Sequence, residues 1–144
     1  MKVVEIYRLK PESRLELPFF IVRLPAGTGY PSPSDDYVEE CIDLNKKLIK
    51  HPEGTYLVRV MGDSMKNARI EEGDFLIVDR SQEPESGDII IAVLDGALTV
   101  KRLIKKPGRW YLEAANPKYP RHEITPEMDF EIWGKVTYIF HPAR

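Results

Sequence analysis

The sequence predicts a mostly β protein: a compact antiparallel β-sheet or barrel-like domain with a short N-terminal helix and an extended N-terminal arm. Short β-branched and aromatic runs separated by turn signals fill the chain from Thr55 onward. Proline and glycine interrupt the first 36 residues repeatedly. The length of 144 residues fits one ordinary domain with an appended arm. We therefore divide the chain into an arm (1–36) and a β domain (37–144).

The arm is expected to be extended or turning, because its prolines and glycines prevent long helices. These residues are Pro11, Pro18, Pro25, Gly27, Gly29, Pro31 and Pro33. The arm also carries the apolar run LPFFIVRL at 17–24. We expect this run to pack as an edge strand or against a second copy.

One amphipathic helix, continuous or broken, is predicted after the arm. Ser34 is a candidate N-cap and is followed by two first-turn acids. The apolar spacing of four, three and four residues is typical of a helix that runs to about 51–52. The residues with this spacing are Tyr37, Cys41, Leu44 and Leu48.

Six strands are predicted in the β domain, at 55–60, 75–79, 88–94, 98–104, 110–115 and 130–140. Asp95-Gly96 separates two of them and has the turn chemistry that a tight hairpin requires. This hairpin places Lys101 on a strand.

Composition narrows the function classes. Lys and Arg total 21 against 23 Asp and Glu, with no long run of one sign and no helix-turn-helix pattern, so direct sequence-specific DNA binding is not expected. A single cysteine, Cys41, excludes an internal disulfide and a CxxC metal or redox site, which suits a reducing cytosol. We expect no metal and no cofactor. No stretch approaches the roughly 18 apolar residues of a membrane span, so we expect a cytoplasmic protein without membrane contact.

Gly62-Asp63-Ser64-Met65 follows the first strand of the β domain. A serine at such a junction can act as a nucleophile, with neighbouring backbone N–H groups facing a developing oxyanion. The same residue types also form an ordinary capped turn. A catalytic reading therefore needs a base, because a serine hydroxyl is a weak nucleophile at its own pKa.

Histidine is the usual base, but nothing selects one of His51, His122 and His141, which lie beside prolines or in polar stretches. Lys101 differs, because it lies in an apolar strand with no acid between residues 96 and 106. A lysine base at neutral pH needs its pKa lowered from about 10.4 to about 7, or roughly 4.6 kcal/mol, which burial can supply. The alternative is that Lys101 points to solvent from a half-buried strand.

Three segments occur in order: GDSM (62–65), ARIEEGDFLIVDR (68–80) and GDIIIAVLDGALTVKRL (87–103), with 37 residues from Ser64 to Lys101. Together they resemble the LexA/UmuD family of self-cleaving peptidases. The similarity is greatest to UmuD-type members, because GYPSPSDDYVE (29–39) and IDLN (42–45) also match. It extends over about residues 29–136.

The resemblance implies a Ser-Lys peptidase-like domain that cuts its own arm. Ser64 would be the nucleophile, Lys101 the general base, and backbone N–H groups of Asp63 and Ser64 the oxyanion donors. Alignment on the YPSP segment places the scissile bond between Thr28 and Gly29.

A second candidate bond lies two residues earlier, between Ala26 and Gly27. The family commonly has Ala or Cys before the glycine, whereas Thr28 is β-branched and stiffer. Ala26 therefore fits the chemistry better, and Thr28 fits the register.

The resemblance also implies partners and a role in the SOS response to DNA damage. A RecA filament on single-stranded DNA would stimulate cleavage. The processed homodimer would then join a Y-family, UmuC-like polymerase in error-prone translesion synthesis.

Two other functions remain open on the sequence, and a third lacks the element that it requires. The chain could be a non-cleaving interaction module of the same fold, or a protease that processes other proteins, as signal peptidases do with a similar Ser-Lys pair. A LexA-like repressor would need a helix-turn-helix, which about 28 irregular residues do not supply.

Overall fold

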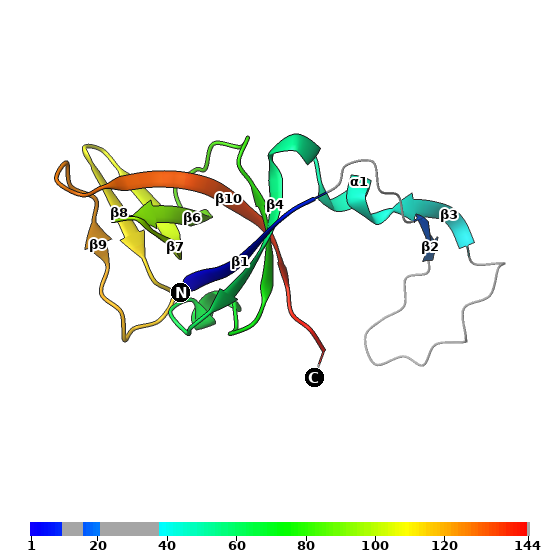
Figure 1. Ribbon diagram of the computed structural model, residues 1–144, viewed down its shortest axis with the longest axis horizontal. Coiled ribbons are helices and arrows are strands. Elements are labelled where there is room, and N and C mark those ends of the chain that lie inside the picture. The colour runs from blue at the N-terminus through cyan, green and yellow to red at the C-terminus, as the bar shows by residue number, and fades with distance from the viewer. Residues whose placement is uncertain (10–15, 21–37, 144) are drawn as a thin grey trace. The chain divides into compact units, whose positions relative to one another are not determined.

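The computed structural model describes residues 1–9, 16–20 and 38–143 (Figure 1). The chain forms two compact units. The larger unit combines residues 1–9 with the chain from His51 onward, and the smaller one covers residues 10–50. Within the described ranges, no helix is both long enough and apolar enough to cross a membrane.

The larger unit is an antiparallel β structure, which confirms the predicted fold class. Its eight strands are β1 (Lys2–Arg8), β4 (Thr55–Met61), β5 (Phe75–Asp79), β6 (Ile89–Leu94), β7 (Ala97–Lys106), β8 (Arg109–Glu113), β9 (His122–Glu123) and β10 (Phe130–Phe140). They are hydrogen-bonded in the order β1-β4-β5-β10-β6-β7-β8-β9. Two 3₁₀ turns, Pro52–Gly54 and Lys66–Ala68, precede and follow β4.

β1 closes the sheet into a barrel-like ring. It pairs with β4 along its length and meets β7 at the pair Lys2 and Thr99 (Figure 1). The Met1 carbonyl accepts hydrogen bonds from the Val100 N–H at 3.0 Å and the Thr99 hydroxyl at 2.9 Å. The first residues of the chain, which the sequence places in the arm, therefore form a strand of this ring.

The predicted hairpin between β6 and β7 is confirmed. Asp95 and Gly96 have φ values of 49° and 83°, so both turn residues are left-handed. Such two-residue turns match the twist of the flanking strands. The hairpin fixes the register in which Lys101 lies opposite Ile90.

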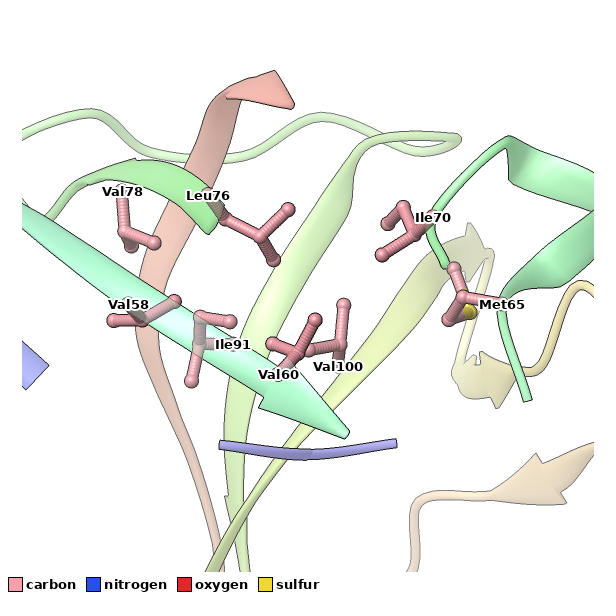
Figure 2. Close-up of a cluster of buried hydrophobic side chains, with 8 residues drawn as sticks. All are labelled: Val58, Val60, Met65, Ile70, Leu76, Val78, Ile91 and Val100. Atoms are coloured by element: carbon pink, nitrogen blue, oxygen red, sulfur yellow. The ribbon is translucent and has the colours of Figure 1, made fainter. Parts of the chain in front are cut away.

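The main core lies between the strands of the ring (Figure 2). It consists of fully buried side chains from β4 to β7 and from the loop after β4, namely Val58, Val60, Met65, Ile70, Leu76, Val78, Ile91 and Val100. Because Met65 belongs to this cluster, the residue beside Ser64 is anchored in the core.

The smaller unit corrects the predicted helix. Its strands β2 (Glu16–Phe20) and β3 (Val38–Asp43) pair antiparallel, and the helix α1 is only Leu44–Leu48. Asp43 is the true N-cap, since its Oδ1 accepts a hydrogen bond from the Asn45 N–H at 3.0 Å. Pairing with β2 satisfies the backbone of 38–43 as a strand and overrides the helical spacing. The proposed cap at Ser34 lies outside the described residues.

Candidate active site

Ser64 lies three residues beyond the end of β4 and is 1% exposed. Gly62 makes the turn out of the strand with a φ of 106°, a conformation that favours glycine. On the other side, Met65 is fully buried, and its sulfur accepts a hydrogen bond from the Ala115 N–H at 3.3 Å. The serine is therefore held between a fixed turn and a core side chain.

Residues that follow β8 hold the serine loop from the other side. The Asn116 side-chain amide donates to the Asp63 carbonyl at 2.9 Å, and the Tyr119 hydroxyl donates to the Asp63 carboxylate at 2.5 Å. The Tyr119 hydrogen bond is the main cause that lowers the pKa of Asp63. Asn116 is itself buried, at 3% exposure. Both hydrogen bonds restrain the residue next to Ser64.

Lys101 lies in the middle of β7 and is partly buried. Burial lowers the pKa of Lys101 below its ordinary value of 10.5. Its Nζ lies 5.6 Å from the centre of the Tyr119 ring. An apolar strand therefore shifts this lysine toward its neutral form, in the direction that a general base needs.

The Met1 amino group connects the serine with the lysine. It donates a hydrogen bond to Ser64 Oγ at 2.5 Å. Burial, followed by repulsion from the positive charge of Lys101, lowers the pKa of this amine to about 6, and attraction to Asp63 opposes the shift. The Met1 carbonyl also accepts from the Val100 N–H at 3.0 Å, so Met1 lies beside both Ser64 and the residue that precedes Lys101.

An open pocket of about 480 Å³ adjoins the serine loop. Asn67, Asn116 and Tyr119 line it and also hold or follow that loop. Glu113 and Arg121 contribute charges of opposite sign to its wall. Ser64 itself is buried and is not among the residues that line this pocket.

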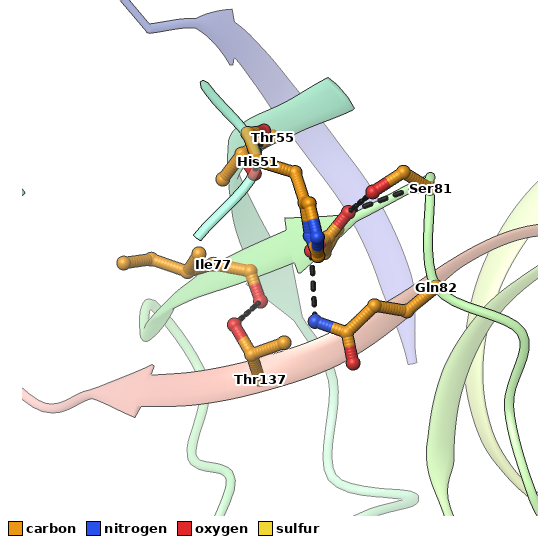
Figure 3. A network of polar contacts seen from close by, with 7 residues as sticks. His51, Thr55, Ile77, Ser81, Gln82 and Thr137 are labelled. Atoms are coloured by element: carbon orange, nitrogen blue, oxygen red, sulfur yellow. Dashed lines mark hydrogen bonds and ion pairs between the residues drawn. The ribbon is translucent and has the colours of Figure 1, made fainter. Parts of the chain in front are cut away.

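Two of the three histidines form other pairs. His51 Nδ1 lies 2.5 Å from one oxygen of Asp79, which also accepts from Gln82 at 2.8 Å; the other oxygen accepts from the Ser81 hydroxyl at 2.5 Å (Figure 3). The carboxylate is thus the central member, whereas a catalytic triad needs histidine between serine and acid. This network satisfies the buried carboxylate of Asp79 with partners that lie nearer the surface.

His141 pairs with the buried Asp74 at 2.7 Å, and His122 lies exposed in β9. Among the residues that the structure describes, neither histidine forms a hydrogen bond with Ser64. The residues at the candidate cleavage bonds, Ala26, Gly27, Thr28 and Gly29, lie outside the described residues.

Asn116 and Tyr119 were not identified from the sequence. They lie more than 50 positions from Ser64, in the loop sequence NPKYP, which has only the composition of a turn. The only local feature that marks Asn116 is its position directly after the predicted strand 110–115. The spacing along the sequence does not indicate that Asp63 is its partner.

The fold is an antiparallel β domain, and the candidate site combines a buried serine with a lysine whose pKa is lowered by burial. Residues 18–137 match the family model described as Peptidase S24-like. Protein SamA of Salmonella typhimurium is 46% identical over 88% of this chain and 86% of its own length. Protein MucA of Escherichia coli is 39% identical over 97% of both chains. LexA repressor 1 of Geobacter sulfurreducens is 36% identical over 81% of this chain and 57% of its own. The chain belongs to the Peptidase S24-like family, which confirms the resemblance to the LexA/UmuD family.

Proposed function

We propose that this protein is a self-cleaving serine peptidase of the SOS response, in which Ser64 and Lys101 cut the N-terminal arm. The observation that carries the proposal is a buried serine whose oxygen accepts a hydrogen bond from the Met1 amine, beside a strand that carries a lysine of lowered pKa. The match to a peptidase family over residues 18–137 supports the reaction type. In this proposal the arm is residues 1–36, of which Lys2–Arg8 form β1 of the larger unit, and the peptidase-like domain is residues 37–144.

The chemistry follows from the roles of the two groups. Neutral Lys101 Nζ accepts the proton of Ser64 Oγ as the oxygen attacks the carbonyl carbon before the scissile bond. Backbone N–H groups of Asp63 and Ser64 stabilise the oxyanion. The protonated lysine then gives its proton to the departing glycine amine, and water releases the acyl group from Ser64.

Cleavage requires a rearrangement at the start of the chain. The Met1 amino group donates a hydrogen bond to Ser64 Oγ, and the serine is 1% exposed. The scissile carbonyl can reach Ser64 only after this contact opens. We propose that the RecA filament on single-stranded DNA favours the open arrangement, in which the arm enters the site.

The cut is proposed between Thr28 and Gly29, with Ala26 and Gly27 as the alternative. Incubation of the purified protein at alkaline pH, where more lysine is neutral, should release a fragment that begins at Gly29. Intact mass distinguishes this product from one that begins at Gly27. Equal cleavage by Ser64→Ala would rule out the serine mechanism.

The processed chain is proposed to act as a cytoplasmic homodimer that binds a Y-family, UmuC-like polymerase and permits translesion synthesis. This part rests on the resemblance to UmuD-type proteins and on the family membership. Gel filtration of the cleaved product with and without the polymerase tests it. Co-elution of the cleaved but not the intact chain is the expected result.

The second candidate is a non-cleaving interaction module of the same fold. The coverage of Ser64 by Met1 favours it, because the nucleophile is closed to solvent in this state. An unchanged mass after prolonged incubation with RecA, nucleotide and single-stranded DNA would support the module and contradict self-cleavage.

A further inference from the structure

The positive charge of this protein is concentrated in one short segment. Residues 101–121 hold seven of the 21 basic side chains and only one of the 23 acidic ones. The segment therefore has a formal charge of +6, while the rest of the chain has −8. The overall charge of −2 hides this separation.

The fold places most of this charge on one part of the sheet. β7 and β8 pair as a hairpin, with Lys106 opposite Arg109, and β9 follows at the sheet edge (Figure 1). Lys106, Arg109, Lys118 and Arg121 are exposed. A basic surface thus extends from the β7–β8 turn to the loop before β9.

Acidic neighbours neutralise only part of this surface. Glu123 lies 3.8 Å from Arg109, and Glu113 is opposite Arg102 in the strand pairing. Lys106 and Arg121 instead lie over the ring of Tyr111, at 6.0 Å and 4.2 Å from its centre. These two cations are held in place by an aromatic ring, and their charge remains available to an anion.

Aromatic rings accompany the cations on both faces of the hairpin. Tyr111 carries Lys106 and Arg121 on one face, and Trp110, which is 37% exposed, lies 4.7 Å from Lys105 Nζ on the other. Cations that follow a phosphate backbone, together with rings on which bases stack, are typical of surfaces that bind single-stranded nucleic acid without sequence preference.

We propose that the β7–β8 hairpin and the loop through Arg121 form a binding surface for single-stranded nucleic acid. Phosphates contact the exposed cations, and bases contact the rings at the hairpin turn. We expect this surface to bind without sequence preference. This binding needs neither Ser64 nor cleavage, so it stands or fails separately from the peptidase proposal.

The test is a titration of the full-length protein into a labelled oligothymidylate of about 16 nucleotides, followed by fluorescence anisotropy. The double variant Lys106→Glu/Arg121→Glu should bind at least about tenfold more weakly at low salt. For this variant, the slope of the logarithm of the binding constant against the logarithm of the salt concentration should be shallower by about 1.4. Each lost phosphate contact on a single strand contributes about 0.7 to that slope. Arg8→Glu, which reverses one exposed cation on β1, is the control for a charge reversal outside this surface and should bind like the original chain.

A second readout uses the aromatic rings. In a Trp133→Phe background, Trp110 is the only tryptophan, and its fluorescence should be quenched by oligothymidylate. Circular dichroism of all variants checks that they remain folded.

Three results would overturn the proposal. They are no saturable binding at low salt, equal losses in the double variant and in Arg8→Glu, and displacement of the oligonucleotide by polyglutamate of the same charge with equal affinity and no Trp110 quenching. The last result would assign the surface to an acidic protein partner.

Discussion

Tyr119 connects the two parts of the site at the scale of single residues. Its hydroxyl holds Asp63 at 2.5 Å, and its ring lies 5.6 Å from Lys101 Nζ. A reaction that depends on the relative position of serine and lysine is sensitive to such a support, since a displacement of about 1 Å can cost about 100-fold in rate. We therefore predict that Tyr119 is a positioning residue for the proposed reaction.

Tyr119→Phe should slow self-cleavage by roughly 10- to 100-fold and leave the thermal midpoint nearly unchanged, because the lost hydrogen bond is exposed. The pKa of Asp63 should move back toward its ordinary value, as seen by NMR titration. Tyr138→Phe is the control, since Tyr138 is similarly exposed, at 41% against 42%. Equal rates for the two variants would remove Tyr119 from the site.

The sequence predicted those site residues whose neighbours along the chain form a distinctive local pattern. Ser64 lies in a recognisable segment, and the apolar neighbours of Lys101 predicted the burial that lowers its pKa. Asn116 and Tyr119 act through contacts across more than 50 positions. Such contacts are set by the closed sheet, and no local pattern encodes them.

Among the elements, β10 meets β5 at an unusually close point. A Cβ added to Gly134 would lie 2.5 Å from Cγ1 of Val78, a fully buried and stiff side chain. Neither partner can give way easily in a close-packed core. The glycine is required here by the neighbouring strand.

Gly134→Ala should therefore lower the free energy of unfolding by about 1–3 kcal/mol, as overpacking typically does. The double variant Gly134→Ala/Val78→Ala should lose less than the sum of the two single losses, because the smaller valine replacement makes room for the new methyl group. Urea unfolding of the four proteins measures the coupling. Additive losses would show that the contact is not the cause.

Prediction of the elements succeeded where a local rule decides the structure. The Asp95-Gly96 turn fixed the central hairpin, and the strands at 75–79 and 130–140 have the predicted bounds. The prediction of a helix was wrong at residues 38–43, because pairing with β2 outweighed the helical spacing of the apolar residues. β1 was missed, since the charges within MKVVEIYRLK hide a strand whose partners are β4 and β7.

For the whole molecule, acid stability should depend strongly on Asp79. Burial raises the pKa of Asp79, but hydrogen bonds from Ser81, His51 and Gln82 outweigh it and lower the value to about 2. A carboxyl whose folded pKa lies below its unfolded value stabilises the fold above the unfolded pKa of about 3.9. This contribution is lost as the pH falls through the folded pKa of about 2.

Asp79→Asn should therefore be less stable than the original chain at pH 7, and the difference should shrink as the pH falls from about 5 toward 2. Urea unfolding at several pH values measures it. Glu127→Gln, on an exposed loop side chain, is the control and should show little difference. If the difference in free energy of unfolding between Asp79→Asn and the original chain did not change with pH, the lowered pKa of Asp79 would not be its cause.

The separation of charge is also a property of the whole molecule. A sequence scan for runs of one sign finds none, because the basic residues of 101–121 are interspersed with apolar strand positions. The hairpin brings them onto neighbouring strands. Counting by segment, with the strand pairing in view, reveals a surface that the overall composition conceals.

The most direct test of the central claim is the initial rate of self-cleavage against pH for the original chain, Ser64→Ala and Lys101→Ala. The original rate should rise with pH and level off below the ordinary lysine pKa of 10.5, because burial lowers the pKa of Lys101. Lys101→Ala should be slower by about 10²- to 10⁴-fold. Ser64→Ala should stay intact at every pH. Cleavage of Ser64→Ala at the original rate, or an unchanged pH profile in Lys101→Ala, would contradict the account.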